Sequence, residues 1–277
     1  MTTQTSSNGE ARTGKLLIMG AVAFLTAAAG IGAVMWQSGP TAASSVPATQ
    51  DADKAAAAAG FDANDKAAIQ AIVRAYILEN PEFIPEAVEQ LRAKQAAKRI
   101  GSVRSQIEQP FAAAFAGNPN GDVILVEYSD FACGFCRQSV SDVARLVGED
   151  KNLKIVFHEL PILSDESRVA AAWGLAAAQQ GKYYAFYKAL FGAGRPNQAT
   201  IEQAAKTAGL DMAAARSFVA SKQADEVIDG NIRVAQQLEF SGTPSWVVGN
   251  KVLNGAVGYD ELKAAIAEVR SSKKTVG

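Results

Sequence analysis

The residues of this chain best suited to chemistry are two cysteines placed three positions apart. Both cysteines of the 277-residue sequence lie in the segment Phe131-Ala132-Cys133-Gly134-Phe135-Cys136. This segment follows a continuous apolar run, Val123–Val126, which predicts a buried strand, and it begins a predicted helix. Cys133 would then lie at a helix N-terminus, where free backbone N–H groups and the helix dipole favour an anion. We therefore expect Cys133 to be a thiolate at neutral pH.

Such a pair is suited to thiol–disulfide exchange. Cys133 would attack a disulfide, and Cys136, nearly one helical turn further along, would resolve the mixed disulfide from a shielded position. A zinc site needs more soft ligands than two cysteines and the single histidine, His158, provide. A haem attachment motif needs histidine after the second cysteine, where Arg137 stands. A structural disulfide across so short a loop would constrain the unfolded chain little, so redox activity is favoured.

The composition excludes several classes of protein. Lys and Arg number 27 and Asp and Glu 28, so the chain has no overall basic charge with which to hold nucleic acid. Hydrophobic residues make up 48% and charged residues 20%, which excludes a disordered chain and supplies a sizeable core. Two cysteines also exclude a disulfide-dense scaffold.

The N-terminal part of the chain contains a candidate membrane segment. Residues 16–36 are 21 consecutive residues without a charge, enough for a helix of about 31 Å that would cross a bilayer core. Arg12 and Lys15 precede this run, so the positive-inside rule predicts that residues 1–15 form a cytoplasmic tail and that the rest is exported. We predict a single-pass anchor in the inner membrane with the catalytic domain in the periplasm or another extracytoplasmic space. The alternative is a cleaved signal peptide that ends before Ser44.

Between this segment and the cysteines, two further regions are expected. Residues 37–60 are rich in Ala, Ser, Thr and Pro and predict a flexible linker. Residues 61–107 predict a helical extension of two helices, separated at Asn80-Pro81, each with an apolar stripe. Two such helices cannot form a core alone. They either pack on the main domain or mediate homo-oligomerisation.

The main domain is predicted to be α/β, with a helical block between its strands. Periodicity and turn signals predict strands at Val123–Val126, Leu153–Leu160, Trp246–Gly249 and Val252–Ala256, helices throughout about 165–240, and a closing helix at Tyr259–Val269.

Several landmarks, in order, resemble one known family. They are Gly117-Asn118-Pro119-Asn120-Gly121-Asp122, Val126-Glu127-Tyr128-Ser129-Asp130, the cysteine motif, Glu159-Leu160-Pro161-Ile162-Leu163, Gly181-Lys182-Tyr183 and Gly242-Thr243-Pro244. Residues 117–270 resemble the DsbA-like branch of the thioredoxin superfamily, most closely its DsbG- and ScsC-like relatives. The resemblance implies a thioredoxin fold with an inserted helical domain, here within residues 110–272.

The resemblance also implies roles for three further residues. Pro244 would follow a cis peptide bond and lie against the cysteines, and the backbone of Thr243 would pair with bound substrate. Glu127 matches a buried acid that relays the proton of Cys136. From the residues alone, an acid in an apolar strand is costly without a task or a partner, and Lys154 on the next strand is a candidate partner. His158 is interpreted as a hydrogen-bonded or solvated strand residue rather than a catalytic one.

The dipeptide between the cysteines departs from the best-known members of the family. Gly134-Phe135 matches neither the Pro-His of DsbA nor the Gly-Pro of thioredoxin, and is nearest the Gly-Tyr of the isomerase DsbC. Phe135 can neither donate a hydrogen bond nor carry charge, so very strong oxidising power is not expected.

These observations leave three functions open. The favoured one is an envelope thiol:disulfide oxidoreductase that oxidises or shuffles cysteines of exported proteins, with a DsbB- or DsbD-like membrane redox partner. The second is an isomerase or reductase fed by a membrane electron donor. The third is a Cu(I)-binding protein that uses the two thiolates, although no Met or His cluster lies near them. No cofactor and no dedicated metal site are expected.

Overall fold

A computed structural model describes residues 47–276, which divide into two compact units, up to Gln70 and from Ala71. The predicted anchor at residues 16–36 lies outside the described residues. Helix α1 (Pro47–Ala58) occupies part of the predicted linker, because its alanine-rich sequence has high helix propensity. Helix α2 (Ala63–Glu79) begins in the first unit and ends in the second. Among the described residues, no helix is long and apolar enough to span a membrane.

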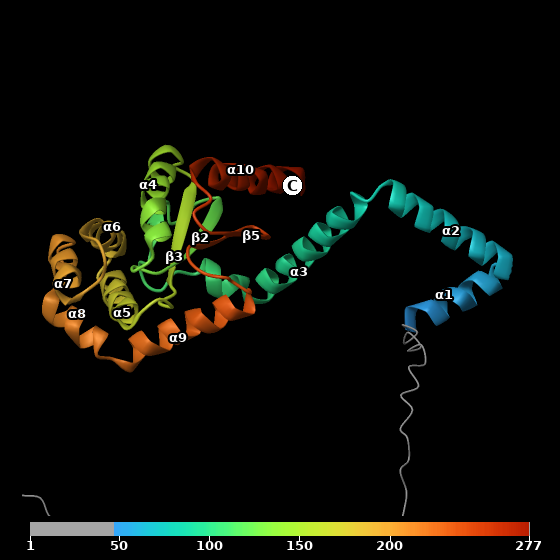
Figure 1. The fold of residues 1–277 in the computed structure, drawn as a ribbon. Helices are drawn as coiled ribbons and strands as arrows, with labels where there is room; N and C mark the ends of the chain where they lie inside the picture. The colour runs from blue at the N-terminus through green and yellow to red at the C-terminus, as the bar shows by residue number, and fades with distance from the viewer. Residues whose placement is uncertain (1–46, 277) are drawn as a thin grey trace, which may run out of the picture. The chain divides into compact units, whose positions relative to one another are not determined.

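The second unit is built on a five-stranded mixed sheet (Figure 1). Its order is β1-β3-β2-β4-β5, with β2 and β3 parallel and the other neighbours antiparallel. The strands are β1 (Phe115–Gly117), β2 (Val123–Ser129), β3 (Leu153–Glu159), β4 (Ser245–Val248) and β5 (Lys251–Asn254). The sequence did not predict β1, because three residues are too few to show an alternating pattern.

Alternate residues of the central strands point to opposite faces of the sheet, and helices cover both faces. On one face, Leu125 belongs to the same buried cluster as Val143 of α4 (Gly134–Glu149) and Ile266 of α10 (Tyr259–Val276). On the other face, Val126 belongs to a cluster with Ile107 of α3 (Phe83–Glu108) and the end of α9 (Lys222–Gln237). Glu127 has the parity of Leu125, so β2 directs it toward the face that carries α4.

The chain between β3 and β4 is helical, as predicted for residues 165–240. The inserted helices are α5 (Asp165–Gln179), α6 (Tyr183–Ala193), α7 (Gln198–Thr207), α8 (Met212–Val219) and α9 (Lys222–Gln237). Four of these helices begin with an N-cap residue whose side chain accepts a backbone N–H of the first turn. These residues are Ser164, Asn197, Asp211 and Ser221. A mixed sheet with a helical insertion between β3 and β4 is the arrangement that the resemblance implied.

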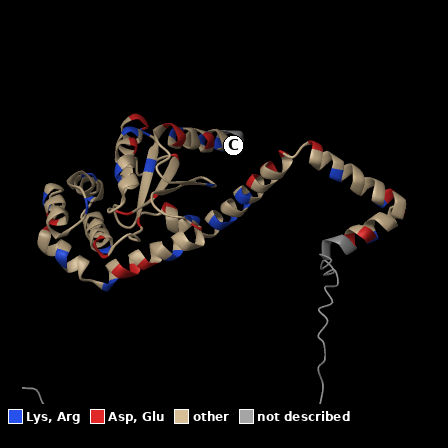
Figure 2. Ribbon diagram, viewed as in Figure 1, with Lys and Arg blue, Asp and Glu red and all other residues tan. Residues whose placement is uncertain are grey.

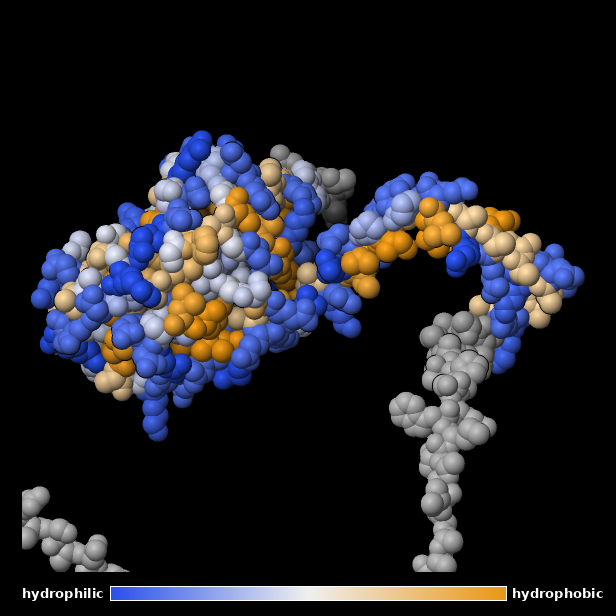
Figure 3. Space-filling model, viewed as in Figure 1, coloured by the Kyte–Doolittle hydropathy of each residue, from blue (hydrophilic) through white to orange (hydrophobic). Residues whose placement is uncertain are grey.

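Helix α3 (Phe83–Glu108) is buried at one end and exposed at the other. Its C-terminal half packs on the sheet through Ile100, Val103 and Ile107. In its N-terminal half, Ile84 is 52% and Leu91 54% exposed, and apolar side chains are visible along this half in Figure 3. Packing on the main domain therefore accounts for only part of the predicted helical extension.

Basic and acidic residues are interspersed over the described chain, as Figure 2 shows. This distribution agrees with the near balance of charge in the sequence.

Candidate active site

Helix α4 places the two cysteines in different environments. Cys133 is the N-cap residue, with an extended backbone, and its sulfur accepts the Cys136 N–H at 3.3 Å. Its side chain remains 5% exposed, whereas Cys136 is fully buried. Both are free thiols, so the structure is that of the dithiol form. The neighbouring Phe135 is 61% exposed.

The turn before β4 brings Thr243 and Pro244 to Cys133, although 110 residues separate Thr243 from it in the sequence. The Thr243–Pro244 peptide bond is cis. The Cys133 sulfur lies 3.2 Å from the Thr243 carbonyl oxygen, to which the thiol donates. Since β4 pairs with β2, the strand that leads into the motif also sets the position of this turn.

Hydrogen bonds lower the pKa of Cys133 to about 5. The largest contribution comes from the Cys136 thiol. The Thr243 side chain and the N–H groups of Cys136 and Phe135 add to it, while burial opposes the shift. Burial raises the pKa of Cys136 far above its usual value, and its hydrogen bond to Cys133 raises it further. At neutral pH the pair therefore holds one thiolate, on Cys133, and one thiol, on Cys136.

Glu127 is a fully buried acid whose partner is Tyr187 of α6. The Tyr187 hydroxyl lies 3.2 Å from each carboxyl oxygen. Burial raises the pKa of Glu127 to about 8, the Tyr187 hydrogen bond opposes the rise, and the charge of Cys133 adds to it. The expectation that Lys154 is the partner is wrong. Lys154 is in register with Ile124, so it lies on the opposite face of the sheet.

His158 is a buried, hydrogen-bonded strand residue, as expected. Its Nε2 lies 2.8 Å from the Ile107 carbonyl oxygen, its Nδ1 lies 3.3 Å from the Asn231 side chain, and its ring stacks on Tyr128. These contacts join β3 to α3 and α9, on the face of the sheet that Glu127 does not share.

Two charged residues that the sequence analysis did not single out hold the motif in place. Asp130 accepts the Ala132 N–H at 2.8 Å with one oxygen, and with the other it accepts the N–H groups of Ile162 and Leu163. Arg137 donates to carbonyl oxygens at the end of α6, at 2.9 and 2.6 Å. An aspartate at the start of a turn is a recognisable signal, but nothing in the sequence connects Arg137 to α6.

A second buried acid, Glu159, lies at the end of β3. The Tyr183 hydroxyl donates to it at 2.7 Å, and burial raises its pKa well above the usual value. A Cβ atom at Gly174 would lie 2.6 Å from its carboxyl oxygen, so glycine in the middle of α5 leaves room for this acid.

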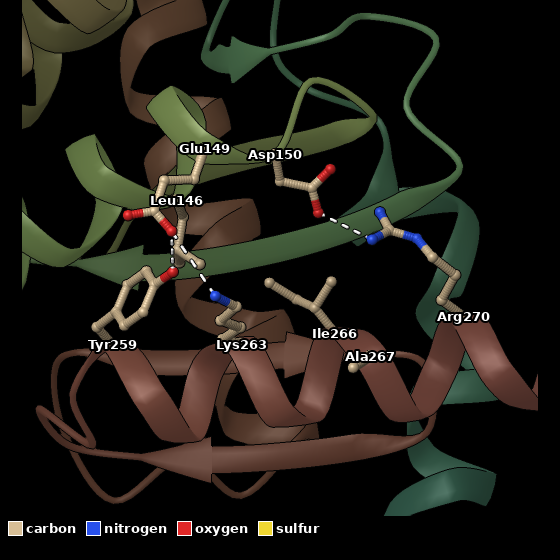
Figure 4. Close-up of a pocket in the computed structure, with 8 residues that line it drawn as sticks. All are labelled: Leu146, Glu149, Asp150, Tyr259, Lys263, Ile266, Ala267 and Arg270. Atoms are coloured by element: carbon tan, nitrogen blue, oxygen red, sulfur yellow. Dashed lines mark hydrogen bonds and ion pairs between the residues drawn. The ribbon is translucent and has the colours of Figure 1, made fainter.

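The pocket in Figure 4 is not the cysteine site. Its volume is about 290 Å³, and it lies between the C-terminal end of α4 and α10, about 20 Å along α4 from Cys133. Its charged side chains are already paired: Lys263 lies 3.7 Å from Glu149, and Arg270 lies 3.0 Å from Asp150. These contacts hold α10 against α4. Within residues 47–276, no cluster of His, Cys, Asp and Glu fits a metal ion.

Two family patterns match the chain. That of the DSBA-like thioredoxin domain matches residues 124–267, and that of the copper resistance protein ScsC N-terminal domain matches residues 65–98. The first covers the sheet apart from β1 and the first residue of β2, together with the cysteine motif and the inserted helices. The second covers most of α2 and part of α3.

Several solved structures have the same fold. A thioredoxin-like oxidoreductase from Silicibacter pomeroyi DSS-3 is 37% identical, with 60% of this chain and 95% of that chain covered and a TM-score of 0.56. The thiol-disulfide exchange protein alpha-DsbA2 from Wolbachia pipientis is 25% identical, with coverage of 65% and 98% and a TM-score of 0.60. Proteus mirabilis ScsC in a transitional conformation is 21% identical, with coverage of 76% and 100% and a TM-score of 0.58, a likeness of fold.

The curated relatives are longer proteins. Na(+)/H(+) antiporter NhaA 1 of Salinispora arenicola is 28% identical over 153 residues, which are 54% of this chain and 24% of the antiporter. NhaA 3 of Salinispora tropica is 26% identical over 161 residues, 25% of its length. The chain thus spans about a quarter of the length of the curated relatives it matches.

Proposed function

The chain belongs to the DSBA-like thioredoxin family, and from this premise we propose that it is a thiol:disulfide oxidoreductase in which Cys133 forms the mixed disulfide with other proteins and Cys136 resolves it. The observation that carries the proposal is the difference between the two sulfurs. Both are buried, but Cys133 retains a small exposed area and Cys136 has none. Hydrogen bonds lower the pKa of Cys133, whereas burial raises that of Cys136.

We propose oxidation and exchange of substrate cysteines as the working direction. A substrate thiolate attacks Cys133 of the Cys133–Cys136 disulfide, which forms a mixed disulfide and releases the Cys136 sulfur. A second substrate thiolate then forms the substrate disulfide and releases Cys133 as a thiolate, so that the protein gains two electrons. A low pKa makes Cys133 a good leaving group, which favours this direction. Hydrogen bonds from the Thr243 side chain and from backbone N–H groups supply the stabilisation that the Phe135 side chain cannot.

The proposed substrates are exported proteins with cysteines. Disulfides of substrate proteins form and persist in oxidising compartments outside the cytoplasm, which agrees with an anchor at residues 16–36 and a periplasmic domain. Exposed apolar side chains at Phe135, Ile162 and Leu163 flank the active-site loop and suit an unfolded segment. A DsbB- or DsbD-like membrane protein would restore the redox state. A reporter fused after Gly60 should be exported, and soluble mature protein starting near Ser44 would contradict the anchor.

Trapping distinguishes the two cysteines. The Cys136→Ser variant should accumulate mixed disulfides with substrates through Cys133. Cys133→Ser should accumulate none, because Cys136 is fully buried. Alkylation of the reduced protein at pH 7 should modify Cys133 first. Preferential alkylation of Cys136 would show that the proposed roles are reversed.

Isomerase or reductase activity is the alternative within the same chemistry. It is favoured by the exposed apolar residues of α2 and α3, because self-association would pair active sites around a misfolded substrate. Reactivation of a protein with scrambled disulfides, against oxidation of a reduced peptide, separates the two activities.

Copper binding is a second candidate, favoured by the match of residues 65–98 to a copper resistance protein domain. The two soft thiolates would be the Cu(I) ligands. Metal stoichiometry of the reduced protein and of Cys133→Ser tests this: one Cu(I) in the former and none in the latter would support it.

A further inference from the structure

The carboxyl group of Glu127 is held by a phenol that family patterns and sequence spacing did not indicate. Tyr187 is fully buried, and its hydroxyl is equidistant, at 3.2 Å, from the two oxygens of Glu127. Its ring packs against the rings of Phe157 and Phe191, with centroids 4.8 and 4.9 Å away. Deep burial and these ring contacts give the hydroxyl a fixed position.

The helix that carries Tyr187 is also tied to the active-site helix. Arg137, the residue after Cys136, donates to the carbonyl oxygens of Phe191 and Gly194 at the end of α6. The guanidinium therefore connects the first turn of α4 to the helix that presents the phenol. Cys136, Glu127 and Tyr187 are therefore carried by two helices and a strand that are linked to one another, and Glu127 acts electrostatically on Cys136.

Several titratable groups face Glu127 from neighbouring elements. They are Cys133 and Cys136 of α4, Tyr183, Tyr184 and Tyr187 of α6, and Glu159 of β3. Of these, Tyr187 is the one whose hydrogen bond favours the carboxylate form of Glu127. The charge of Cys133 disfavours that form.

The resolving step requires a proton acceptor. When the mixed disulfide is resolved from within the protein, which is the reverse of the first step of substrate oxidation, Cys133 is bonded to the substrate sulfur and Cys136 must lose its proton before it can attack. Transfer of this proton to the Glu127 carboxylate gives a Cys136 thiolate and a neutral carboxyl group. The thiolate then forms the Cys133–Cys136 bond as the Cys133–substrate bond breaks, and the substrate leaves with the electron pair as a thiolate. A donor that stabilises the carboxylate before transfer increases the fraction of Glu127 that can accept the proton at neutral pH.

We propose that Tyr187 is a positioning residue for this step: its phenol holds the Glu127 carboxylate ready to receive the Cys136 proton. The inference rests on the proposed roles of Cys133 and Cys136. It adds a residue of the inserted helical domain to the machinery of the thioredoxin domain.

The test is the pH profile of the resolving step, measured in a single turnover of reduced protein with a fluorescent peptide in a mixed disulfide. For the wild type, the rate of peptide release should rise with pH. Its midpoint should lie somewhat below the pKa of about 8 that Glu127 has beside the Cys133 thiolate, because Cys133 carries no charge in the mixed disulfide. Tyr187→Phe should move the midpoint about one to two pH units higher and slow release at pH 7 about 10- to 100-fold, as expected for loss of one hydrogen bond to a charged group. In Glu127→Gln, the rise of the release rate with pH that is assigned to this carboxyl group should disappear.

Tyr183→Phe is the matched control. It removes a buried phenol one turn away on the same helix, but Tyr183 donates to Glu159 and not to Glu127. Its midpoint should remain that of the wild type. An unchanged profile in Tyr187→Phe, or an equal shift in both variants, would overturn the inference.

Two further measurements keep the test decisive. If Tyr187→Phe does not fold, difluorotyrosine at position 187 keeps the ring and strengthens the donor, so the midpoint should move to lower pH. An unmoved midpoint would overturn the inference. The Cys136→Ser variant distinguishes failure of the proposed function from failure of the role of Tyr187. If this variant traps no mixed disulfide, the proposed function itself is wrong. With trapping but no shift in the profile, only the role of Tyr187 fails.

Discussion

At the scale of single residues, position decides the chemistry of two identical side chains. Cys133 caps a helix and is surrounded by donors, so its pKa falls to about 5, whereas burial raises that of Cys136. The donors come from both sides of the site: from the motif itself, and from Thr243 before β4. The reactivity of Cys133 therefore depends on residues far away in the sequence.

Replacing Thr243 by Val should raise the pKa of Cys133, because it removes one donor to the thiolate while keeping the shape of the side chain. We expect the midpoint of the alkylation rate against pH to rise by about one unit from its wild-type value near 5. At pH 7 this corresponds to a reduction potential lower by about 30 mV, since the thiolate is the form that loses stability. Ser245→Ala removes a nearby hydroxyl that bonds to Gly242 and Asn254 instead, and should leave the midpoint unchanged.

Glu127 should make the stability of the reduced protein fall as pH rises. Its pKa is about 8 in the folded protein and 4.5 as a free side chain, so the folded state binds the proton more tightly. The loss of folding stability caused by ionising Glu127 begins above pH 4.5 and reaches its full value above pH 8. Glu127→Gln should remove it, with a gain of up to about 5 kcal/mol at pH 9 and little gain at pH 4. Urea unfolding at the two pH values measures the difference, and an equal effect at both would contradict the assignment.

At the scale of elements, strand pairing and helix contacts assemble the site from four segments. Strand β2 leads into the motif, β4 follows the Thr243–Pro244 turn, α4 begins at Cys133, and α6 supplies Tyr187. The inserted helices are thus part of the site. Gly174 of α5 shows how closely they fit the central domain, because its missing side chain makes room for the Glu159 carboxyl.

Gly174→Ala should destabilise the domain although alanine is the better helix former. The new Cβ would lie 2.6 Å from the Glu159 oxygen, and that carboxyl cannot move freely because it is buried and bonded to Tyr183. We expect a loss of about 1–3 kcal/mol. Gly148→Ala in α4 meets no atom within 4 Å and should instead gain about 0.5–1 kcal/mol. Thermal unfolding of the two variants should therefore shift in opposite directions.

Much of this arrangement could be predicted, for identifiable reasons. Local sequence is enough to show the continuous apolar runs of β2 and β3 and the helical spacing of residues 165–240. The spacing of the two cysteines likewise places them about one helical turn apart. The partner of Glu127 could not be found in this way. Tyr187 is 60 residues away, and its orientation depends on how α6 packs. Lys154 was chosen by proximity along strands, which ignores the face on which each side chain lies.

At the scale of the whole molecule, the apolar surface of the helices before the catalytic domain is exposed. Ile72 and Leu78 of α2 are 68% and 67% exposed, and Ile84 and Leu91 of α3 are more than half exposed. Apolar side chains that recur along a helix and remain in water usually mark an interface. The packed end of α3, from Ile100 onward, limits any deletion, because removal of its side chains would uncover the core.

The prediction is that the exported region self-associates through this surface. Light scattering of residues 47–277 should give a mass greater than one chain, because association would bury the apolar residues of α2 and the first half of α3. Ile84→Glu with Leu91→Glu places two charges in the interface and should give a monomer with unchanged alkylation of Cys133. Gln90→Glu with Gln95→Glu adds the same charge to the same helix at polar positions and should remain associated. A monomeric parent protein would contradict the prediction, and equal dissociation by both pairs would show that charge, and not the apolar surface, controls assembly.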